Sequence, residues 1–234
     1  MSLSAHYKLN DNAANTVVAD ASGNGHDGTA SSNTSTLSIS AKVALGFDLS
    51  ASAATYIDVT GLTSTTQSYT FAAWVWGTLT QNTITQTYIF DSQTGRLIIY
   101  YSLAVSGDYG YGIYDGTNKS FAAGLIATGA WNHIAIVFDG VAGEATLYIN
   151  GVQAGDVIAY VPKNLGGAIR IGNRYSDIYG SRAKLDDVRI YDEALPLWKI
   201  KAIYNFGKGS EECEPWQRLI RPTIQPVPRP LIGV

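Results

Sequence analysis

Apolar and polar residues alternate along most of the chain before residue 208. Successive side chains of a strand point to opposite faces, so this pattern predicts strands that bury one face. Two further segments, 70–76 and 133–138, are apolar at nearly every position and are typical of central strands covered on both faces. The clearest alternating segments are 56–59, 146–150, 168–172 and 185–191.

Turn and helix signals separate these strands. Asn150-Gly151 stands between two alternating segments and predicts a two-residue hairpin. The segment 195–205 is predicted to be a helix, with Pro196 near its first turn and Gly207 beyond its end. We expect roughly twelve to fourteen short strands. The predicted fold class is all-β: an antiparallel two-sheet jelly-roll sandwich with one short C-terminal helix.

The composition changes after residue 208. Two of the seven prolines stand before that point, and the other five follow it, at 215, 222, 226, 228 and 230. Closely spaced prolines cannot donate to a helix or a sheet, so this part is predicted to be an extended arm. We divide the chain into a jelly-roll domain, 1–208, and an extended C-terminal arm containing proline and arginine, 209–234.

Composition and charge argue against several classes of protein. The net charge of the 234 residues is −3, whereas a nucleic-acid-binding domain normally carries a basic stripe. Fifteen tyrosines, five tryptophans and six phenylalanines supply a core that disordered chains lack. No apolar run is long enough to span a membrane, and the first residues do not show the pattern of a secretory signal. A single cysteine excludes an internal disulfide.

Five motifs stand in an order that is similar to a known family. They cover 6–9 with 20–28, then 69–75, 131–140 with 147–151, 185–191, and 194–195. Over residues 4–206 this series resembles the laminin-G-like jelly-roll domains of the concanavalin-A-like lectin and glucanase superfamily. The resemblance implies two curved antiparallel sheets. It implies no particular activity, since the fold hosts lectins, glycosidases, adhesion modules and structural proteins.

The carboxylates and histidines argue against catalysis. Glycoside hydrolysis needs two carboxylates about 5–10 Å apart, and glucanases of this fold carry theirs on one strand as Glu-x-Asp-x-x-Glu. None of the glutamates fits that spacing, and the adjacent Asp186 and Asp187 of a strand would point to opposite faces. His6, His26 and His133 lack the spacing of a metal site or a Ser-His pair. We therefore expect that the protein is not an enzyme.

Hard oxygen ligands gather in a turn near the N-terminus. Asp20, Ser22 and Asn24 supply carboxylate, hydroxyl and amide oxygens there. In similar domains a structural calcium ion joins the early loop to the late Asp-Val-Arg strand. The resemblance therefore implies Asp20, Asn24 and Asp187 as ligands of a structural Ca²⁺. The alternative is that Asp20 and Asn24 only stabilise the turn by bonding backbone amides.

Aromatic residues offer a candidate ligand surface. Tyr109, Tyr111 and Tyr114 stand in a run that alternates with glycine, which predicts a tyrosine row able to stack on sugar rings. The alternative is that this row packs against a neighbouring strand or subunit, where glycine permits close approach. Both interpretations remain open at this point.

Other conspicuous side chains have structural explanations. Trp74 matches the core tryptophan of the family, and His133 stands in its Trp-x-His strand, where packing and hydrogen bonding are expected. Three arginines, Arg170, Arg174 and Arg182, lie near Asp177 and are interpreted as a solvated mixture of charges rather than an anion site. No function is assigned to these residues.

The arm combines apolar side chains with three arginines. It is either a disordered tail or a docking segment, and disordered tails usually lack large apolar residues. Proline lowers the entropy cost of docking, so we predict that the arm binds a groove or sheet edge of another chain. The residues expected to make this contact are Trp216, Arg218, Leu219, Ile220, Arg221, Ile224, Val227, Arg229, Leu231 and Ile232.

These features lead to two function hypotheses. The first is a non-catalytic structural or decoration protein displayed on a larger assembly, such as the virion of a bacterial virus. Its arm would anchor it to sister subunits or to a scaffold or capsid protein. The second is a carbohydrate-binding lectin or adhesion module with glycan partners, in one version dependent on calcium. Both place the protein on a virion or an extracellular surface, without nucleic acid or membrane as partners.

Overall fold

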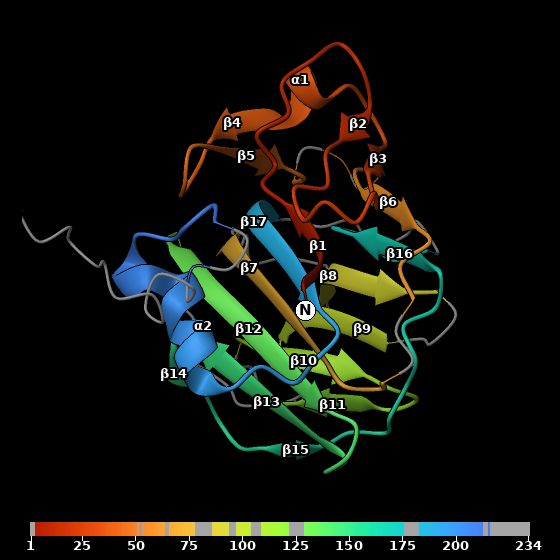
Figure 1. The fold of residues 1–234 in the computed structure, drawn as a ribbon, viewed down its shortest axis with the longest axis vertical. Helices are drawn as coiled ribbons and strands as arrows, with labels where there is room; N and C mark the ends of the chain where they lie inside the picture. The colour runs from red at the N-terminus through yellow and green to blue at the C-terminus, as the bar shows by residue number, and fades with distance from the viewer. Residues whose placement is uncertain are drawn as a thin grey trace, which may run out of the picture.

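The computed structural model describes residues 3–50, 52, 54–63, 66–77, 86–93, 97–103, 109–121, 129–175, 183–212 and 215. Two antiparallel sheets lie face to face, and a short helix covers one side of the pair (Figure 1). The prediction of an all-β jelly-roll sandwich with one short C-terminal helix is confirmed. Neither helix in the described part of the chain is long and apolar enough to cross a membrane.

Sheet A, the sheet nearer the viewer in Figure 1, has nine strands. Their order is β14-β13-β12-β7-β17-β5-β4, while β1 pairs with β17 and β15 pairs with β13. The two segments predicted as central strands fall in the neighbours β7 and β12. The strands of sheet A are β1 (Leu3–Tyr7), β4 (Ser38–Ser40), β5 (Leu45–Asp48), β7 (Tyr69–Gly77), β12 (Trp131–Asp139), β13 (Glu144–Ile149), β14 (Val152–Gln153), β15 (Ile158–Ala159) and β17 (Ala183–Tyr191).

Sheet B lies behind sheet A in Figure 1 and has eight strands. Their order is β11-β10-β9-β8-β16-β6-β3-β2, so β16 sits between β8 and β6 although it comes much later in the chain. The strands of sheet B are β2 (Val17–Val18), β3 (Gly28–Ala30), β6 (Ile57–Thr60), β8 (Gln86–Ser92), β9 (Leu97–Leu103), β10 (Tyr109–Tyr114), β11 (Asn118–Ser120) and β16 (Ala168–Ile171).

The main hydrophobic core fills the space between the two sheets. Phe71 of sheet A and Phe90 of sheet B meet there, with ring centroids 5.3 Å apart. Ile136 and Ile169 belong to the same buried cluster and have no exposed surface. Burying one such side chain stabilises the fold by about 1.5–3 kcal/mol. The alternation in the sequence therefore produces one inward and one outward face on each sheet.

The hairpin between β13 and β14 has the geometry that its sequence predicts. Asn150 and Gly151 connect the strands with φ angles of 52° and 75°. Positive φ at both central residues is the signature of the type I′ turn, whose twist matches that of the flanking strands. The hairpin predicted at Asn150-Gly151 is confirmed.

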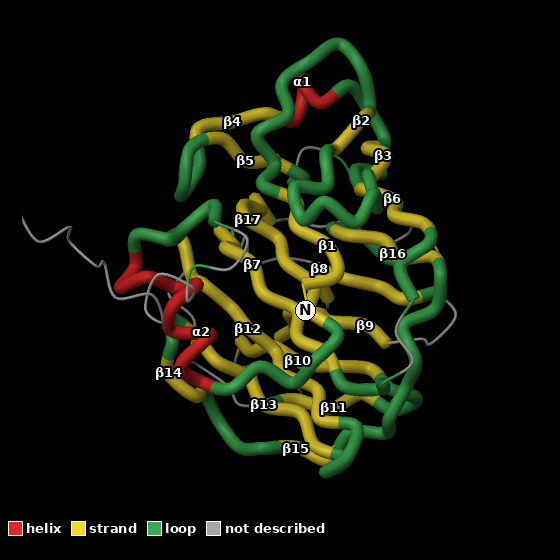
Figure 2. Tube along the Cα trace, viewed as in Figure 1, coloured by secondary structure: helices red, strands yellow, loops and turns green. Residues whose placement is uncertain are grey.

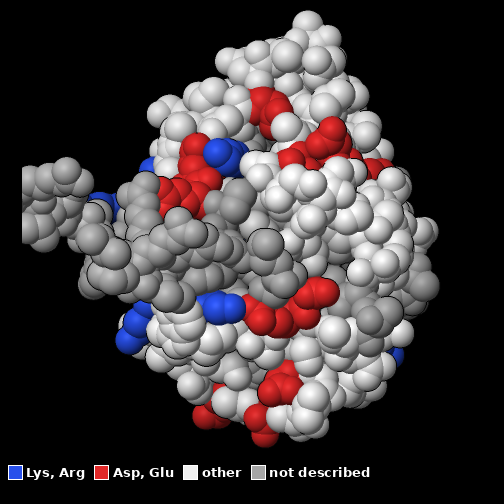
Figure 3. Space-filling model, viewed as in Figure 1, with Lys and Arg blue, Asp and Glu red and all other residues white. Residues whose placement is uncertain are grey.

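The outer face of sheet A is covered by the C-terminal helix α2 (Leu197–Tyr204), which continues into a 3₁₀ turn, Asn205–Gly207. Ile200 and Ile203 of α2 are buried in a second apolar cluster that includes Ala72 of β7. The other helix, α1 (Thr34–Leu37), has one turn and lies near β4 and β2 (Figure 2). Figure 3 shows acidic and basic side chains next to one another on the face that carries α2.

Candidate functional site

The outer face of sheet B carries polar side chains in register across neighbouring strands. Asp58 of β6 pairs with Arg170 of β16, and Arg170 pairs on its other side with Asp91 of β8. The flanking Ile169 and Ile171 lie in the core between the sheets. Because side chains alternate along a strand, Arg170 points away from that core. The sequence pattern of β16 thus places a guanidinium on the outer face.

Asp58 holds the guanidinium of Arg170 by two parallel hydrogen bonds. Arg170 Nε donates to Asp58 Oδ1 over 2.7 Å, and Nη2 donates to Oδ2 over 2.9 Å. Paired bonds of this kind between ionised groups are among the strongest and most specific that a guanidinium makes. The Arg170 side chain is 7% exposed, whereas that of Asp58 is 33% exposed. The carboxylate therefore forms the solvent side of the pair.

Two tyrosine rings flank the same guanidinium. Its central carbon lies 3.6 Å from the ring centroid of Tyr56 and 4.6 Å from that of Tyr175. Arg174 lies over a third ring, that of Tyr88, at 5.8 Å. Both Tyr56 and Tyr175 are half-buried. Burial raises the pKa of Tyr175 to about 12, so its phenol keeps its proton at neutral pH and can donate a hydrogen bond.

Buried polar groups fix the segment that follows β16. The backbone N–H of Tyr175 donates to Asp91 Oδ2 over 3.1 Å. The side-chain carbonyl of Asn173 accepts from the backbone N–H of Arg174 over 2.7 Å. Asp91 and Asn173 are both buried, so these bonds lie away from competing water. They hold the ring of Tyr175 beside β16 before any ligand arrives.

This arrangement suits a flat, polyhydroxylated ligand. Half-buried rings offer apolar faces, and the charged groups beside them are fixed donors and acceptors at their edge. The site combines three charged side chains with three aromatic rings. We call it the tyrosine–arginine surface, and it consists of Tyr56, Asp58, Arg170 and Tyr175, with Tyr88 and Arg174 beside them.

The predicted tyrosine row is divided between the two faces of sheet B. Tyr111 is 2% exposed and packs in the core between the sheets, so its assignment to the ligand surface is wrong. The pleat turns Tyr111 inward and Tyr114 outward. Tyr114 is half-buried. It belongs to the same cross-strand row as Asp91, because both residues pair with Ile98 of β9, Asp91 from β8 and Tyr114 from β10. The side chain of Tyr109 lies outside the described residues.

Asp20 and Asn24 stabilise the N-terminal turn through hydrogen bonds. Asp20 Oδ1 accepts from the backbone N–H groups of His6 and Ser22, and Oδ2 accepts from the Ser22 hydroxyl and the backbone N–H of His26. Burial would raise the pKa of Asp20, but these bonds hold it below its usual value. Asn24 donates to the carbonyls of Leu3 and Ser4. The geometry matches the alternative interpretation of this turn.

Asp187 lies in a buried network of charges. Its Oδ1 accepts from His6 Nε2 over 2.6 Å, and the guanidinium of Arg189 bonds both carboxylate oxygens over 3.0–3.2 Å. All three side chains are fully buried. The expected alternation of Asp186 and Asp187 is interrupted here by a β-bulge, at which Asp187 has a φ of 52°.

The predicted calcium ligands do not form a calcium site in the described part of the chain. No three His, Cys, Asp or Glu side chains gather there as metal ligands would. Ca²⁺ needs six to eight oxygens, whereas protein donors already bond the carboxylate oxygens of Asp20 and Asp187. The donor set therefore does not fit the ion, and calcium binding stays a prediction from the sequence.

Sequence reasoning missed the tyrosine–arginine surface. Arg170 was interpreted as a solvated charge, which is wrong because it is almost wholly buried. Tyr56 and Asp58 stand in an alternating segment that was recognised only as a strand. Nothing in the sequence shows that β6 and β16 are neighbours, which is what brings Asp58 to Arg170. Asp177, the carboxylate considered beside Arg170, and Arg182 lie outside the described residues.

The outer face of sheet A holds a second row in register, formed by His133, Trp74 and Asp186. Each is at most 1% exposed, so the expected packing of Trp74 and His133 is confirmed, whereas the hydrogen bonding expected of the His133 side chain is not found among the described residues. In the described part of the chain, Trp74 Nε1, both ring nitrogens of His133 and Asp186 Oδ1 have no hydrogen-bond partner. Burial raises the pKa of Asp186 to about 7 and lowers that of His133 to about 4.

The first residues of the predicted arm are bonded to the domain. Arg189 donates to the backbone carbonyls of Ser210 and Glu212. A Cβ added at Gly209 would lie 2.4 Å from a methyl of Val43 and 2.9 Å from Trp74 Nε1, so only glycine fits there. Residues 209–212 therefore close over the buried row of sheet A. All the predicted contact residues of the arm, 216–232, lie outside the described residues.

Comparison of the sequence with protein families gives one match. The model of a family described as the concanavalin A-like lectin/glucanases superfamily matches residues 49–201. Those residues run from the end of β5 to the middle of α2 and include the whole tyrosine–arginine surface. A search of curated protein sequences found no match.

Solved structures similar to this chain share its fold. Domain 4 of AbnA, an extracellular arabinanase from Geobacillus stearothermophilus solved with arabinotriose, is 24% identical, with a TM-score of 0.64 over 85% of this chain and 96% of that domain. The ligand-binding domain of botulinum neurotoxin serotype D, in complex with N-acetylneuraminic acid, is 18% identical, with a TM-score of 0.62 over 87% of this chain and 50% of that one. An SAP-like pentraxin from Limulus polyphemus is 21% identical, with a TM-score of 0.53 over 64% and 75%.

Proposed function

Because the chain belongs to the concanavalin A-like lectin and glucanase superfamily, we propose that it is a carbohydrate-binding domain whose ligand binds the tyrosine–arginine surface. The observation that carries the proposal is the fixed cluster in which Asp58 holds Arg170 between Tyr56 and Tyr175. Two domains of similar fold, one in complex with arabinotriose and one with N-acetylneuraminic acid, support a sugar as the ligand class.

Binding on this surface is non-covalent and follows from the chemistry of its groups. The ring faces of Tyr56 and Tyr175 pack against the C–H groups of a sugar ring. The exposed side of the Asp58 carboxylate accepts hydrogen bonds from sugar hydroxyls. Since buried bonds already hold the segment around Tyr175, little side-chain entropy is lost when a ligand binds.

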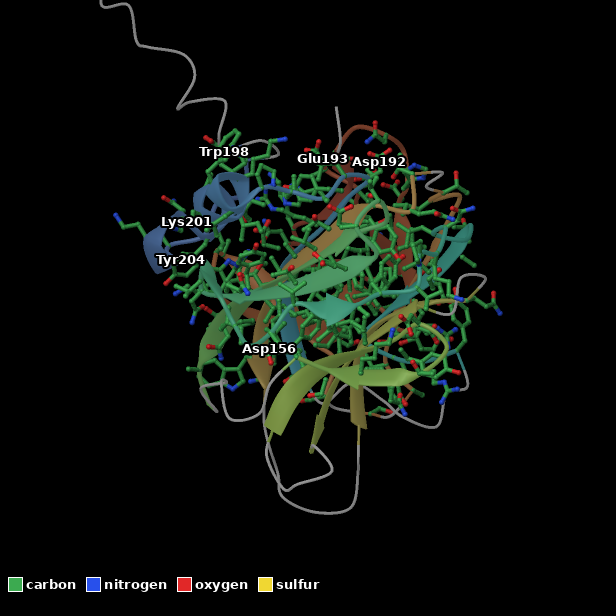
Figure 4. All side chains as sticks on the ribbon, turned by 90° about the horizontal axis from the view of Figure 1, so that it is seen from below. Asp156, Asp192, Glu193, Trp198, Lys201 and Tyr204 are labelled. Atoms are coloured by element: carbon green, nitrogen blue, oxygen red, sulfur yellow. The ribbon has the colours of Figure 1, made fainter. Side chains whose placement is uncertain are left out.

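A glycan-binding assay with the full chain tests this proposal. Tyr175→Ala and Tyr56→Ala each remove one ring, and we expect each to weaken binding roughly tenfold, which is about 1.4 kcal/mol. The matched control is Trp198→Ala, because Trp198 is a 48% exposed aromatic residue on α2. Figure 4 shows Trp198 on the opposite side of the sandwich from the yellow-green strands of sheet B.

Two outcomes would contradict the carbohydrate proposal. The first is that the folded wild-type protein binds none of the glycans in a broad panel of neutral and acidic sugars. The second is a loss of binding in Trp198→Ala that equals the loss in Tyr175→Ala, because the ligand would then not sit on sheet B. Circular dichroism of each variant separates lost binding from lost folding.

A second proposal concerns the arm: we propose that it anchors the domain to sister subunits or to a scaffold, as in a virion. The bonds from Arg189 to Ser210 and Glu212 support this proposal, because they fix the root of the arm to the domain. A chain that ends at Glu212 keeps this root and loses the apolar remainder of the arm. We expect this shortened chain to stay folded but no longer to assemble, which light scattering measures. Equal assembly of both chains would refute anchoring.

A further inference from the structure

We infer that Asp58 makes the tyrosine–arginine surface selective for uncharged sugars by occupying the position where a ligand carboxylate would bind. The inference rests on the proposed carbohydrate function and adds the class of sugar. Its basis is the pair of Asp58 and Arg170, in which one protein carboxylate already fills the fork of a guanidinium. Asp58 is thereby a specificity-determining residue of the surface.

Arg170 is built as a receptor for a carboxylate. A guanidinium presents a planar fork whose geometry matches the two oxygens of a carboxylate. Here the rings of Tyr56 and Tyr175 flank the guanidinium, so its position does not depend on Asp58 alone. The fork is fixed in advance, which lowers the entropy cost of binding an anion there.

The exposures of the two side chains show which partner a ligand meets. Asp58 is 33% exposed and Arg170 only 7% exposed, so solvent reaches the pair from the carboxylate side. An acidic sugar approaching the surface therefore meets the negative charge of Asp58 before the guanidinium. It would have to displace a carboxylate tethered to the same sheet, and a tethered group competes at a high effective concentration.

Uncharged sugars meet no such obstacle. A hydroxyl donates to the exposed lone pairs of Asp58 without breaking its bonds to Arg170. The pair then serves as a neutral unit with a fixed acceptor at its edge. Asp91, the second cross-strand neighbour of Arg170, adds a further negative charge beside the site. Arg174 carries a positive charge in the same surface, so the preference for a neutral ligand depends on Asp58 filling the fork of Arg170 and not on the net charge around it.

Removal of the Asp58 carboxylate should reverse this selectivity. In Asp58→Ala the Nε–H and Nη2–H donors of Arg170 lose the Asp58 carboxylate, which leaves a space of carboxylate size on the solvent side of the pair. Asp58→Asn keeps the volume and removes the charge, so it provides a second, milder variant. The matched control is Asp48→Ala, because Asp48 is a 28% exposed carboxylate paired with Lys184 over 3.8 Å on sheet A.

The experiment compares two sugars that differ at one carbon, galactose and galacturonic acid, as oligomers titrated into the full-length protein. We expect Asp58→Ala to bind the galacturonate oligomer at least tenfold more tightly than wild type, and Asp58→Asn to gain less. Wild type and Asp48→Ala should prefer the neutral oligomer. A titration of Asp58→Ala with acetate, followed by NMR through the Arg170 Nε–H signal, tests whether the guanidinium binds a carboxylate when no sugar is present.

The outcomes separate this inference from the proposed function. Folded Asp58 variants that gain neither galacturonate nor acetate binding would overturn the inference, as would a wild type that binds galacturonate as tightly as galactose. If wild type binds no neutral sugar while Asp58→Ala gains acetate and galacturonate, the role of Asp58 against anions stands and the carbohydrate function fails. Gain of anion binding together with wild-type binding of neutral sugar supports both.

Discussion

The two outer faces of the sandwich carry the same kind of residues and differ in what covers them. On sheet A, the row of His133, Trp74 and Asp186 lies beneath Tyr204 of α2 and the segment 209–212. In the described part of the chain, Trp74 Nε1, both ring nitrogens of His133 and Asp186 Oδ1 have no hydrogen-bond partner, whereas Asp186 Oδ2 accepts from the backbone N–H of Val43. On sheet B, the polar side chains pair with one another, and their outermost members are half-exposed.

This difference teaches that an outward position in the sequence pattern does not decide whether a residue is structural or functional. Arg189 on sheet A and Arg170 on sheet B each bind a carboxylate through two guanidinium nitrogens. Arg189 is fully buried and also holds the chain after α2, so its pair is part of the fold. The partner of Arg170 reaches solvent, so that pair can meet a ligand.

The largest expected effect is a difference in stability when the carboxylate that holds each arginine is neutralised, Asp187 on sheet A and Asp58 on sheet B. Asp187→Asn leaves the charge of Arg189 buried without its ionic partner, so we expect the free energy of unfolding to fall by about 3–5 kcal/mol. Asp58 is 33% exposed, so in Asp58→Asn water can replace part of the lost interaction with Arg170, and we expect the free energy of unfolding to fall by only about 1 kcal/mol. Urea unfolding of both variants measures the two values, and equal costs would refute the distinction between the faces.

The next effect concerns pH and sheet A. Folding raises the pKa of Asp186 from 3.8 to about 7, because its carboxyl is buried beside Trp74. The unfolded chain therefore releases this proton first, and stability should fall as the pH rises from about 4 to about 7. His133 acts in the opposite direction, since its lowered pKa makes stability fall as the pH drops from 6.5 toward 4.

Comparison with Asp186→Asn isolates the contribution of the carboxyl group. We expect the stability of wild type relative to Asp186→Asn to fall by about 4 kcal/mol between pH 4 and pH 8, since one pKa unit corresponds to about 1.4 kcal/mol. Urea unfolding at several pH values measures this difference. A difference that is constant with pH would show that Asp186 titrates like a solvated carboxylate.

A smaller effect tests the segment over sheet A. A chain that ends at Lys208 loses the carbonyls of Ser210 and Glu212, which accept hydrogen bonds from Arg189. Hydrogen bonds to a charged group contribute about 1.5–3 kcal/mol, so we expect this chain to be less stable than one ending at Glu212 by about 2 kcal/mol. Thermal unfolding compares the two chains. Equal melting temperatures would place 209–212 outside the folded domain.

The smallest expected effect concerns calcium. Since Arg189 and His6 already bind Asp187, we expect a chelator to leave the melting temperature of the protein unchanged. The sequence-based hypothesis predicts the opposite: a chelator lowers the melting temperature, and Asp187→Ala removes that sensitivity. A clear decrease with chelator, restored by added Ca²⁺, would show that the charge network of Asp187 is not complete without an ion.

Much of the fold was predictable because it depends on local pattern. Period-two alternation identified the strands, and Asn150-Gly151 identified a hairpin through its tolerance of positive φ. Local pattern failed at Asp187, where a bulge with a φ of 52° interrupts the alternation. It also failed at Tyr111, because the pattern Tyr-Gly-Tyr-Gly does not state which face of its strand meets the other sheet.

The sequence by itself determined the strands, the C-terminal helix, the sandwich class and the family, because these follow from periodicity and from motifs in a fixed order. Only the tertiary structure decided which strands are neighbours, which outward face is covered, and which acid meets each arginine. Asp58 and Arg170 are 112 positions apart, and their contact depends on the insertion of β16 between β6 and β8. The physical reason is that a strand's side chains record which residues share a face, while pairing and coverage depend on distant segments.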